Sequence, residues 1–71
     1  HYAEGAIVYE IDARGNIVLC VGWARNQLGA KRLFDYLCAE YPETGYRVQH
    51  RSRLIGERLP PPGAPPRLPE S

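Results

Sequence analysis

The sequence predicts a small α+β domain in which one amphipathic helix packs on one face of a small antiparallel sheet. Two stretches of alternating apolar residues, 6–11 and 17–22, flank a turn-forming sequence. Apolar residues at helical spacing follow Asn26, and a further alternating stretch begins at Tyr46. The expected order is β-β-α-β, with room for a fourth strand, and a helix laid on the sheet gives the domain two layers.

The first hairpin is predicted from its turn and from the alternation on both sides of it. Asp12 and Gly15 stand at the first and fourth positions of a type I turn. If Ile11 faces Ile17, alternation gathers the larger apolar side chains on one side, which we expect the helix to bury. That side comprises Ile7, Tyr9, Ile11, Ile17, Leu19 and Val21, and Trp23 continues it as a packing residue at the edge of the core. The other side, which we expect to stay open, comprises Ala6, Val8, Glu10, Val18, Cys20 and Gly22.

The helix is predicted to begin after Asn26, a residue suited to the N-cap, and to stop near Glu40 because Pro42 disfavours helical geometry at the residue before it. Gly29 weakens the first turn of the helix by about 1 kcal/mol relative to Ala. A close approach of the helix backbone to the sheet would explain why a glycine stands at this position. The stripe expected to face the sheet is Ala30, Leu33, Phe34, Leu37 and Tyr41, with Cys38 beside it.

The segment after the helix predicts one or two further strands. Residues 46–51 alternate, and residues 54–59 form either a fourth strand or a loop. If His50 pairs with Ile55, Arg47 lies opposite Arg58 on the open side of the sheet, an unfavourable pairing of like charges. We expect His50 to be a packed residue, half-buried under the helix.

We assign residues 1–59 to this single domain and residues 60–71 to a disordered, proline-rich tail. Six prolines in twelve residues remove the amide donors that a strand or helix needs. Pro62, Pro65 and Arg67 fit the PxxPxR spacing of ligands that bind as a polyproline II helix. Both interpretations of the tail, a spacer and a ligand, stay open.

Several functional classes are excluded by what the sequence lacks. It has no apolar run of membrane-spanning length, no phosphate-binding loop, no dinucleotide motif and no calcium loop. Cys20 and Cys38 lack zinc-site spacing, and we expect both to be small buried residues, as free cysteines commonly are. A disulfide between them is the alternative, and it would require an oxidising compartment. We therefore expect no metal, no cofactor and no membrane partner, and a cytoplasmic location.

We also expect no enzymatic activity and no catalytic residue. His50 is the one internal histidine, and nothing in the spacing brings Cys20 or Cys38 to it as a nucleophile.

The function expected from these elements is a non-catalytic protein-interaction or regulatory module that forms a homodimer through its open sheet face. The interface residues expected there are Val8, Glu10, Val18 and Cys20. An arginine of the second hairpin would meet Glu10 of a second copy.

The alternative function is an accessory protein that binds nucleic acid. Residues 47–59 hold four arginines and a single acid, although the whole chain carries a net charge of only +1. In this interpretation the anion contacts are made by Arg47, Arg51, Arg53 and Arg58.

Overall fold

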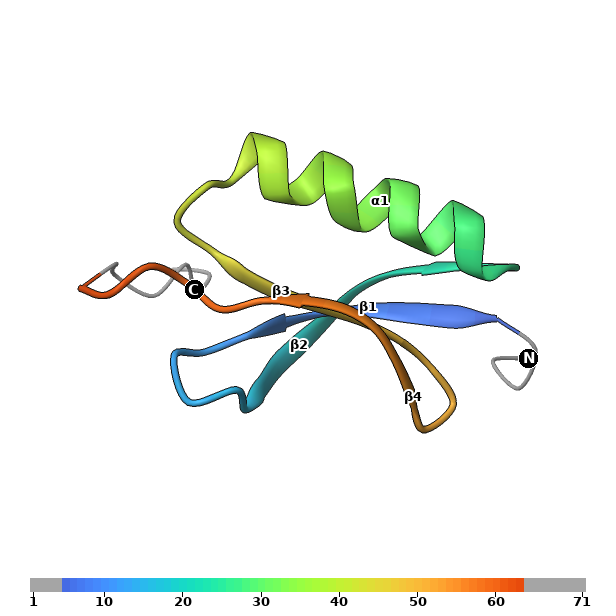
Figure 1. Ribbon diagram of the computed structural model, residues 1–71, viewed down its shortest axis with the longest axis horizontal. Coiled ribbons are helices and arrows are strands. Elements are labelled where there is room, and N and C mark those ends of the chain that lie inside the picture. Colours follow the sequence, from blue (N-terminus) through green and yellow to red (C-terminus); the bar gives the residue numbers. More distant parts are fainter. Residues whose placement is uncertain (1–4, 64–71) are drawn as a thin grey trace.

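The structure, a computed structural model, describes residues 5–63 of the chain. Residues 64–71 of the expected proline-rich tail, with Pro65 and Arg67 of the PxxPxR spacing, lie outside the described residues. It contains β1 (Ala6–Ile11), β2 (Ile17–Ala24), α1 (Gln27–Glu40), β3 (Gly45–His50) and β4 (Arg53–Arg58). The four strands form one antiparallel sheet in the order β2-β1-β3-β4, and α1 covers one of its faces (Figure 1). The predicted α+β class is confirmed, and residues 53–58 are a true fourth strand.

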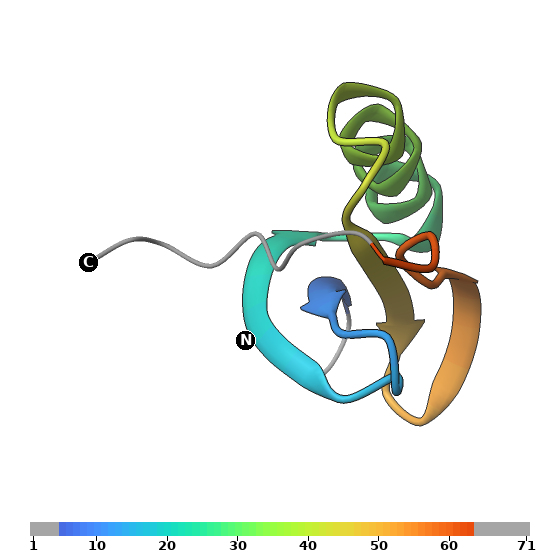
Figure 2. The same ribbon diagram turned by 90° about the vertical axis from the view of Figure 1, so that its left-hand side faces the viewer.

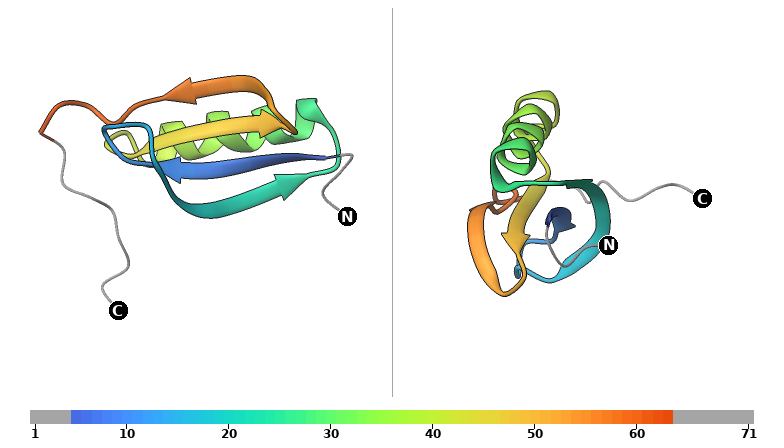
Figure 3. Two further views of the ribbon diagram at one scale, coloured as in Figure 1. Left: turned by 90° about the horizontal axis from the view of Figure 1, so that it is seen from below. Right: turned by 90° about the vertical axis from the view of Figure 1, so that its right-hand side faces the viewer.

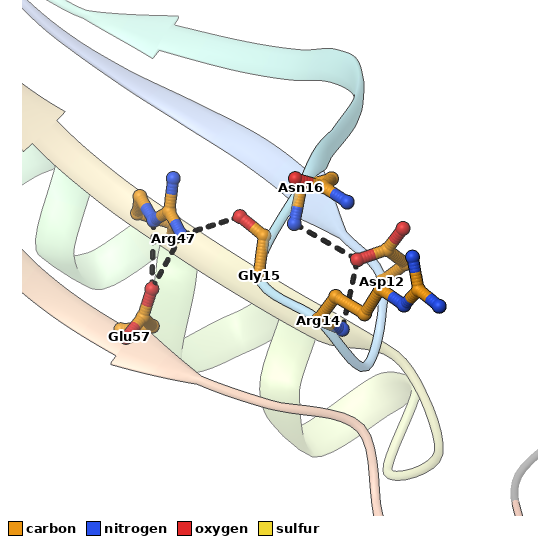
Figure 4. Close-up of polar contacts among 6 residues, drawn as sticks. All are labelled: Asp12, Arg14, Gly15, Asn16, Arg47 and Glu57. Carbon is orange, nitrogen blue, oxygen red and sulfur yellow. Dashed lines mark hydrogen bonds and ion pairs between the residues drawn. The ribbon is translucent and has the colours of Figure 1, made fainter.

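The turn between β1 and β2 forms where the sequence predicts it. One carboxylate oxygen of Asp12 accepts hydrogen bonds from the backbone N–H groups of Asn16 (2.8 Å) and Arg14 (2.9 Å), as Figure 4 shows. The N–H of Gly15 donates to the Asp12 carbonyl, and Gly15 has a φ of +87°, which glycine adopts without strain. The hydrogen bond from Asn16, followed by the one from Arg14, holds the pKa of Asp12 below its usual range.

Helix α1 also begins and ends as expected. The Asn26 side chain accepts a hydrogen bond of 2.8 Å from the N–H of Gly29, and the helix stops at Glu40, two residues before Pro42. A Cβ added to Gly29 would lie 3.3 Å from the Cβ of Ala24 at the end of β2. The first turn of the helix therefore approaches the sheet closely, which is the reason expected for a glycine at this position.

For β1, the side of the sheet that the helix covers is the opposite of the one expected. On β2 the expectation is partly confirmed, because Val21 packs against the core and Leu19 lies opposite the buried Glu10. The fully enclosed core beneath α1 contains small side chains of β1 together with residues of α1 and β3: Ala6, Val8, Ala30, Phe34, Tyr46 and Val48. Leu33, Leu37 and Cys38 pack against this core, as expected. Tyr41, in contrast, follows the helix and is exposed, so its expected place in the buried stripe is wrong.

Two features of the sheet explain the inversion. The pairing of β1 with β2 contains two irregularities, so that Tyr9 lies opposite Cys20 and Ile7 opposite Trp23, although Ile11 faces Ile17 as expected. Bulges of this kind change which side chains share a face and increase the twist, and β2 bends around β1 (Figure 2).

The second feature is the size of the side chains beneath the helix. Gly22 of β2 lies directly under Leu33, whose side chain fills the space that a Cβ at position 22 would need. The side with Ala6, Val8 and Gly22 lets the helix approach the sheet, whereas the side with Ile7 and Tyr9 would hold it away.

The second hairpin is confirmed, but its pairing differs from the expected one, by two residues at His50 and by one residue at Arg47. Arg51 and Ser52 form a two-residue turn in which Arg51 has a φ of +59°. An irregularity between Val48 and Gln49 then shifts the pairing by one residue, so that Arg47 lies opposite Glu57 rather than opposite Arg58. The expected opposition of two arginines is wrong, and in its place the sheet has an ion pair.

Arg58 lies on the helix side of the sheet, not on the open side. Its guanidinium donates hydrogen bonds to the carbonyls of Cys38 (3.1 Å), Tyr41 (2.7 Å) and Thr44 (2.6 Å), which belong to the last turn of α1 and the loop after it. The carbonyl of Cys38, in the last turn of the helix, faces Pro42 four residues on, which has no N–H to donate, and Arg58 supplies its partner from β4.

Candidate interaction surface

The face of the sheet opposite α1, here called the open face, is seen from below in Figure 3 (left). Residues paired directly across neighbouring strands point to the same face, so the register determines its members. They are Ile7, Tyr9 and Ile11 of β1, Ile17, Cys20 and Trp23 of β2, Arg47 and Gln49 of β3, and Leu54 and Glu57 of β4. Ile11 is buried on this face, and Ile7 and Tyr9 are half-buried.

The apolar part of the open face follows the edge strand β2. Ile17 is 51% exposed, Trp23 is 40% exposed, and Cys20 between them is also exposed. The indole of Trp23 lies against the backbone of Gly5, where any side chain would overlap it. A ring held in this way presents a fixed apolar surface, and such surfaces are common at protein interfaces.

The polar part of the open face is an ion pair anchored to a turn. Arg47 binds the carboxylate of Glu57 at 2.7 Å and donates a second hydrogen bond of 2.7 Å to the carbonyl of Gly15, so it links β3, β4 and the first turn (Figure 4). Because both charges are partly buried and paired, this strip carries little net charge.

The interface residues expected from the sequence are distributed differently in the structure. Val8 is fully buried and Glu10 is 3% exposed, both on the side that the helix covers, so the expectation that they lie on the open face is wrong. Val18 stands at an irregularity of the β1–β2 pairing and is half-buried. Of the four expected interface residues, Cys20 is the one that is exposed on the open face.

The residues that sequence reasoning missed are Ile7, Tyr9, Ile17 and Trp23, since all were assigned to the core. One signal for the correct side was present in the sequence. Gly22, like Ala6, is too small to fill a core by itself and marks the strand positions that a helix can approach closely.

The four arginines proposed as anion contacts do not form one strip. Arg47 and Arg58 are held by the contacts described above, whereas Arg51 and Arg53 are exposed at the β3–β4 turn. His50 is half-buried, as expected, and its Nδ1 lies 3.3 Å from the amide nitrogen of Gln27 at the start of α1.

Both cysteines are free thiols, and Cys20 is exposed, so the expectation that both are buried is wrong for Cys20. Cys38 packs against the core, and this burial raises the pKa of its thiol. Within residues 5–63, no three His, Cys, Asp or Glu side chains gather as a metal site would require. The one helix of this described part is too short and too polar to cross a membrane.

No protein-family model, curated protein or solved structure matches the chain. The functional argument therefore depends on the chemistry of the open face.

Proposed function

We propose that this protein is a small non-catalytic protein-interaction module that self-associates as a homodimer through its open face. The observation that carries the proposal is the row of Ile17, Cys20 and Trp23 on the edge strand β2, which leaves large apolar side chains in contact with solvent. Contiguous apolar surface on a small domain is typical of an interaction site.

The charges of the open face also favour a second copy as the partner. In a two-fold symmetric interface the same patch meets itself, so an unpaired charge near its centre would repel its own equivalent. The Arg47–Glu57 pair avoids this repulsion because each copy neutralises its own charge. A free arginine strip, in contrast, would favour an anionic partner.

Sedimentation velocity across a range of protein concentrations tests the proposal. We expect the mass to rise from 8.0 kDa toward twice that value as the concentration increases. Ile17→Glu should keep the protein monomeric, because an unpaired charge in a buried interface costs about 3–5 kcal/mol. Ile17 is suited to this change because it is exposed and contributes little to the core.

Leu28→Glu is the matched control. Leu28 is 61% exposed, on the helix that covers the opposite side of the sheet, so this variant should dimerise like the unaltered protein. A constant monomer mass at all concentrations, or equal effects of the two variants, would contradict the proposal.

Nucleic-acid binding is the second candidate, and the exposure of Arg51 and Arg53 at the β3–β4 turn favours it. Binding to phosphates should weaken steeply with added salt and weaken again in Arg53→Ala. Undetectable or salt-independent binding removes this candidate. A cytoplasmic location belongs to the first proposal and is supported by the free thiols of Cys20 and Cys38.

A further inference from the structure

We propose that the proline-rich segment 64–71 of the same chain docks on the open face and competes there with the second copy. The competition rests on the proposed self-association, whereas the docking itself does not. Four features of the chain favour this occupant: the place where the chain leaves β4, the turn that follows, the length of the segment, and the aromatic residues on the face.

The chain leaves β4 against the edge of the open face. Pro60 occupies the space that a side chain at Gly45 would need, beside the carbonyl of Ile11. Tyr46 points toward the helix, so alternation along β3 places the Gly45 position on the open face. The tail therefore begins at the end of this face that lies near the β1–β2 turn.

A turn then reverses the chain. Pro62 and Gly63 form it, with Gly63 at a φ of +81°. Proline followed by glycine at positive φ is typical of a type II turn. Because β4 runs outward toward this end of the sheet, a tail that docks on the open face has to reverse its direction here, and this turn supplies such a reversal.

The segment is long enough to follow β2. Eight residues in the polyproline II conformation span about 25 Å at roughly 3.1 Å each. The six steps between Ile17 and Trp23 span about 20 Å at roughly 3.3 Å each. The segment is thus slightly longer than the apolar row that we propose it covers.

The chemistry of the two surfaces is complementary. Polyproline II segments bind aromatic side chains and lose little conformational entropy in doing so. Tyr9 and Trp23 occupy diagonal positions across the β1–β2 pair, within reach of one another. The segment carries Pro65, Pro66 and Pro69, and Leu68 adds an aliphatic side chain.

The segment can compete with a second copy of the protein because it is attached to the chain whose face it covers. A segment tethered by a short linker is present at an effective concentration of about 1 mM or more, so weak docking suffices. Dimerisation needs an open face on both copies. If the tail covers the face in about 90% of molecules, the apparent dimer affinity falls about tenfold for each copy, or about 100-fold in total.

The experiment uses Trp23, the single tryptophan of the chain, as the reporter. Acrylamide quenching of its fluorescence is compared, at a concentration where sedimentation shows monomers, between the full chain and a chain that ends at Gly63. Quenching should increase on truncation. A full-length variant in which 64–71 is replaced by glycine and serine should behave like the truncated chain, and a synthetic 64–71 peptide should restore protection. Both variants keep Pro60 on Gly45, and circular dichroism verifies their fold.

The outcomes separate this inference from the proposed function. Equal quenching in the full and truncated chains would overturn the docking of the tail, whatever the oligomeric state. Exposure of Trp23 on removal of residues 1–4, but not of 64–71, would assign the face to the N-terminal segment and also overturn it. Increased quenching with a dimer about 100-fold tighter supports docking and competition. Increased quenching without dimerisation at any concentration supports docking and refutes self-association.

Discussion

The contact between Arg58 and the end of α1 gives the sharpest prediction about stability. Arg58→Ala removes three hydrogen bonds from a guanidinium to the carbonyls of Cys38, Tyr41 and Thr44. The bond to Tyr41 is exposed, and water can replace it. The other two are partly buried, and a hydrogen bond to a charged group contributes about 1.5–3 kcal/mol.

Counting only the two partly buried bonds at the lower value predicts that the free energy of unfolding falls by about 3 kcal/mol. A change of 1 kcal/mol shifts the melting temperature of a domain of this size by about 4–8 °C, so Tm should fall by roughly 12–24 °C. Arg58→Lys should lie between, because a lysine ammonium lacks the planar fork that reaches several carbonyls at once.

Urea unfolding followed by Trp23 fluorescence and by circular dichroism measures this change. Arg53→Ala is the matched control, because Arg53 lies on the same strand, is exposed, and should alter the stability by less than about 0.5 kcal/mol. A loss below about 1 kcal/mol for Arg58→Ala, or equal losses for both variants, would refute the account of how the helix end is held.

Two further predictions concern packing and thiol reactivity. Gly45→Ala should destabilise the domain by about 1–3 kcal/mol, because the added Cβ would overlap backbone atoms on two sides. Gly56→Ala is the control and should be tolerated, because its Cβ would meet only side chains, at 3.4 Å or more. Similar urea midpoints for the two variants would contradict this prediction. Cys20 should react with iodoacetamide faster than Cys38, because Cys20 is exposed while burial raises the pKa of Cys38 and keeps its thiol protonated at neutral pH. Faster labelling of Cys38, read by mass spectrometry, would show that the helix does not cover it.

The local elements of this protein could be predicted from its sequence because neighbouring residues determine them. Asp12 and Gly15 specify the first turn through their own backbone hydrogen bonds, and Asn26 specifies the start of the helix in the same way. Pro42 ends the helix by a steric effect on the residue before it. The order of elements and the class of fold follow from these signals together with the alternation of the strands.

The candidate surface was predicted less well because both sides of the first hairpin are apolar. The alternation of residues correctly places Ile7 and Tyr9 on one face of the strand and Ala6 and Val8 on the other, but it does not determine which face packs against the helix. Cys20 was therefore placed on the open face, as in the structure, while Val8 and Glu10 were placed there wrongly.

Only the tertiary structure decided which face is open. The choice depends on how closely α1 can approach β2 at Gly22 and Gly29, on the pairing of β1 with β3, and on two irregularities in the register of β1 and β2. The register of the second hairpin also depends on tertiary packing. It pairs Arg47 with Glu57 and leaves Arg58 to bind the end of the helix. Each of these contacts joins residues far apart in the chain, so its energy depends on a packing that no local stretch of sequence contains.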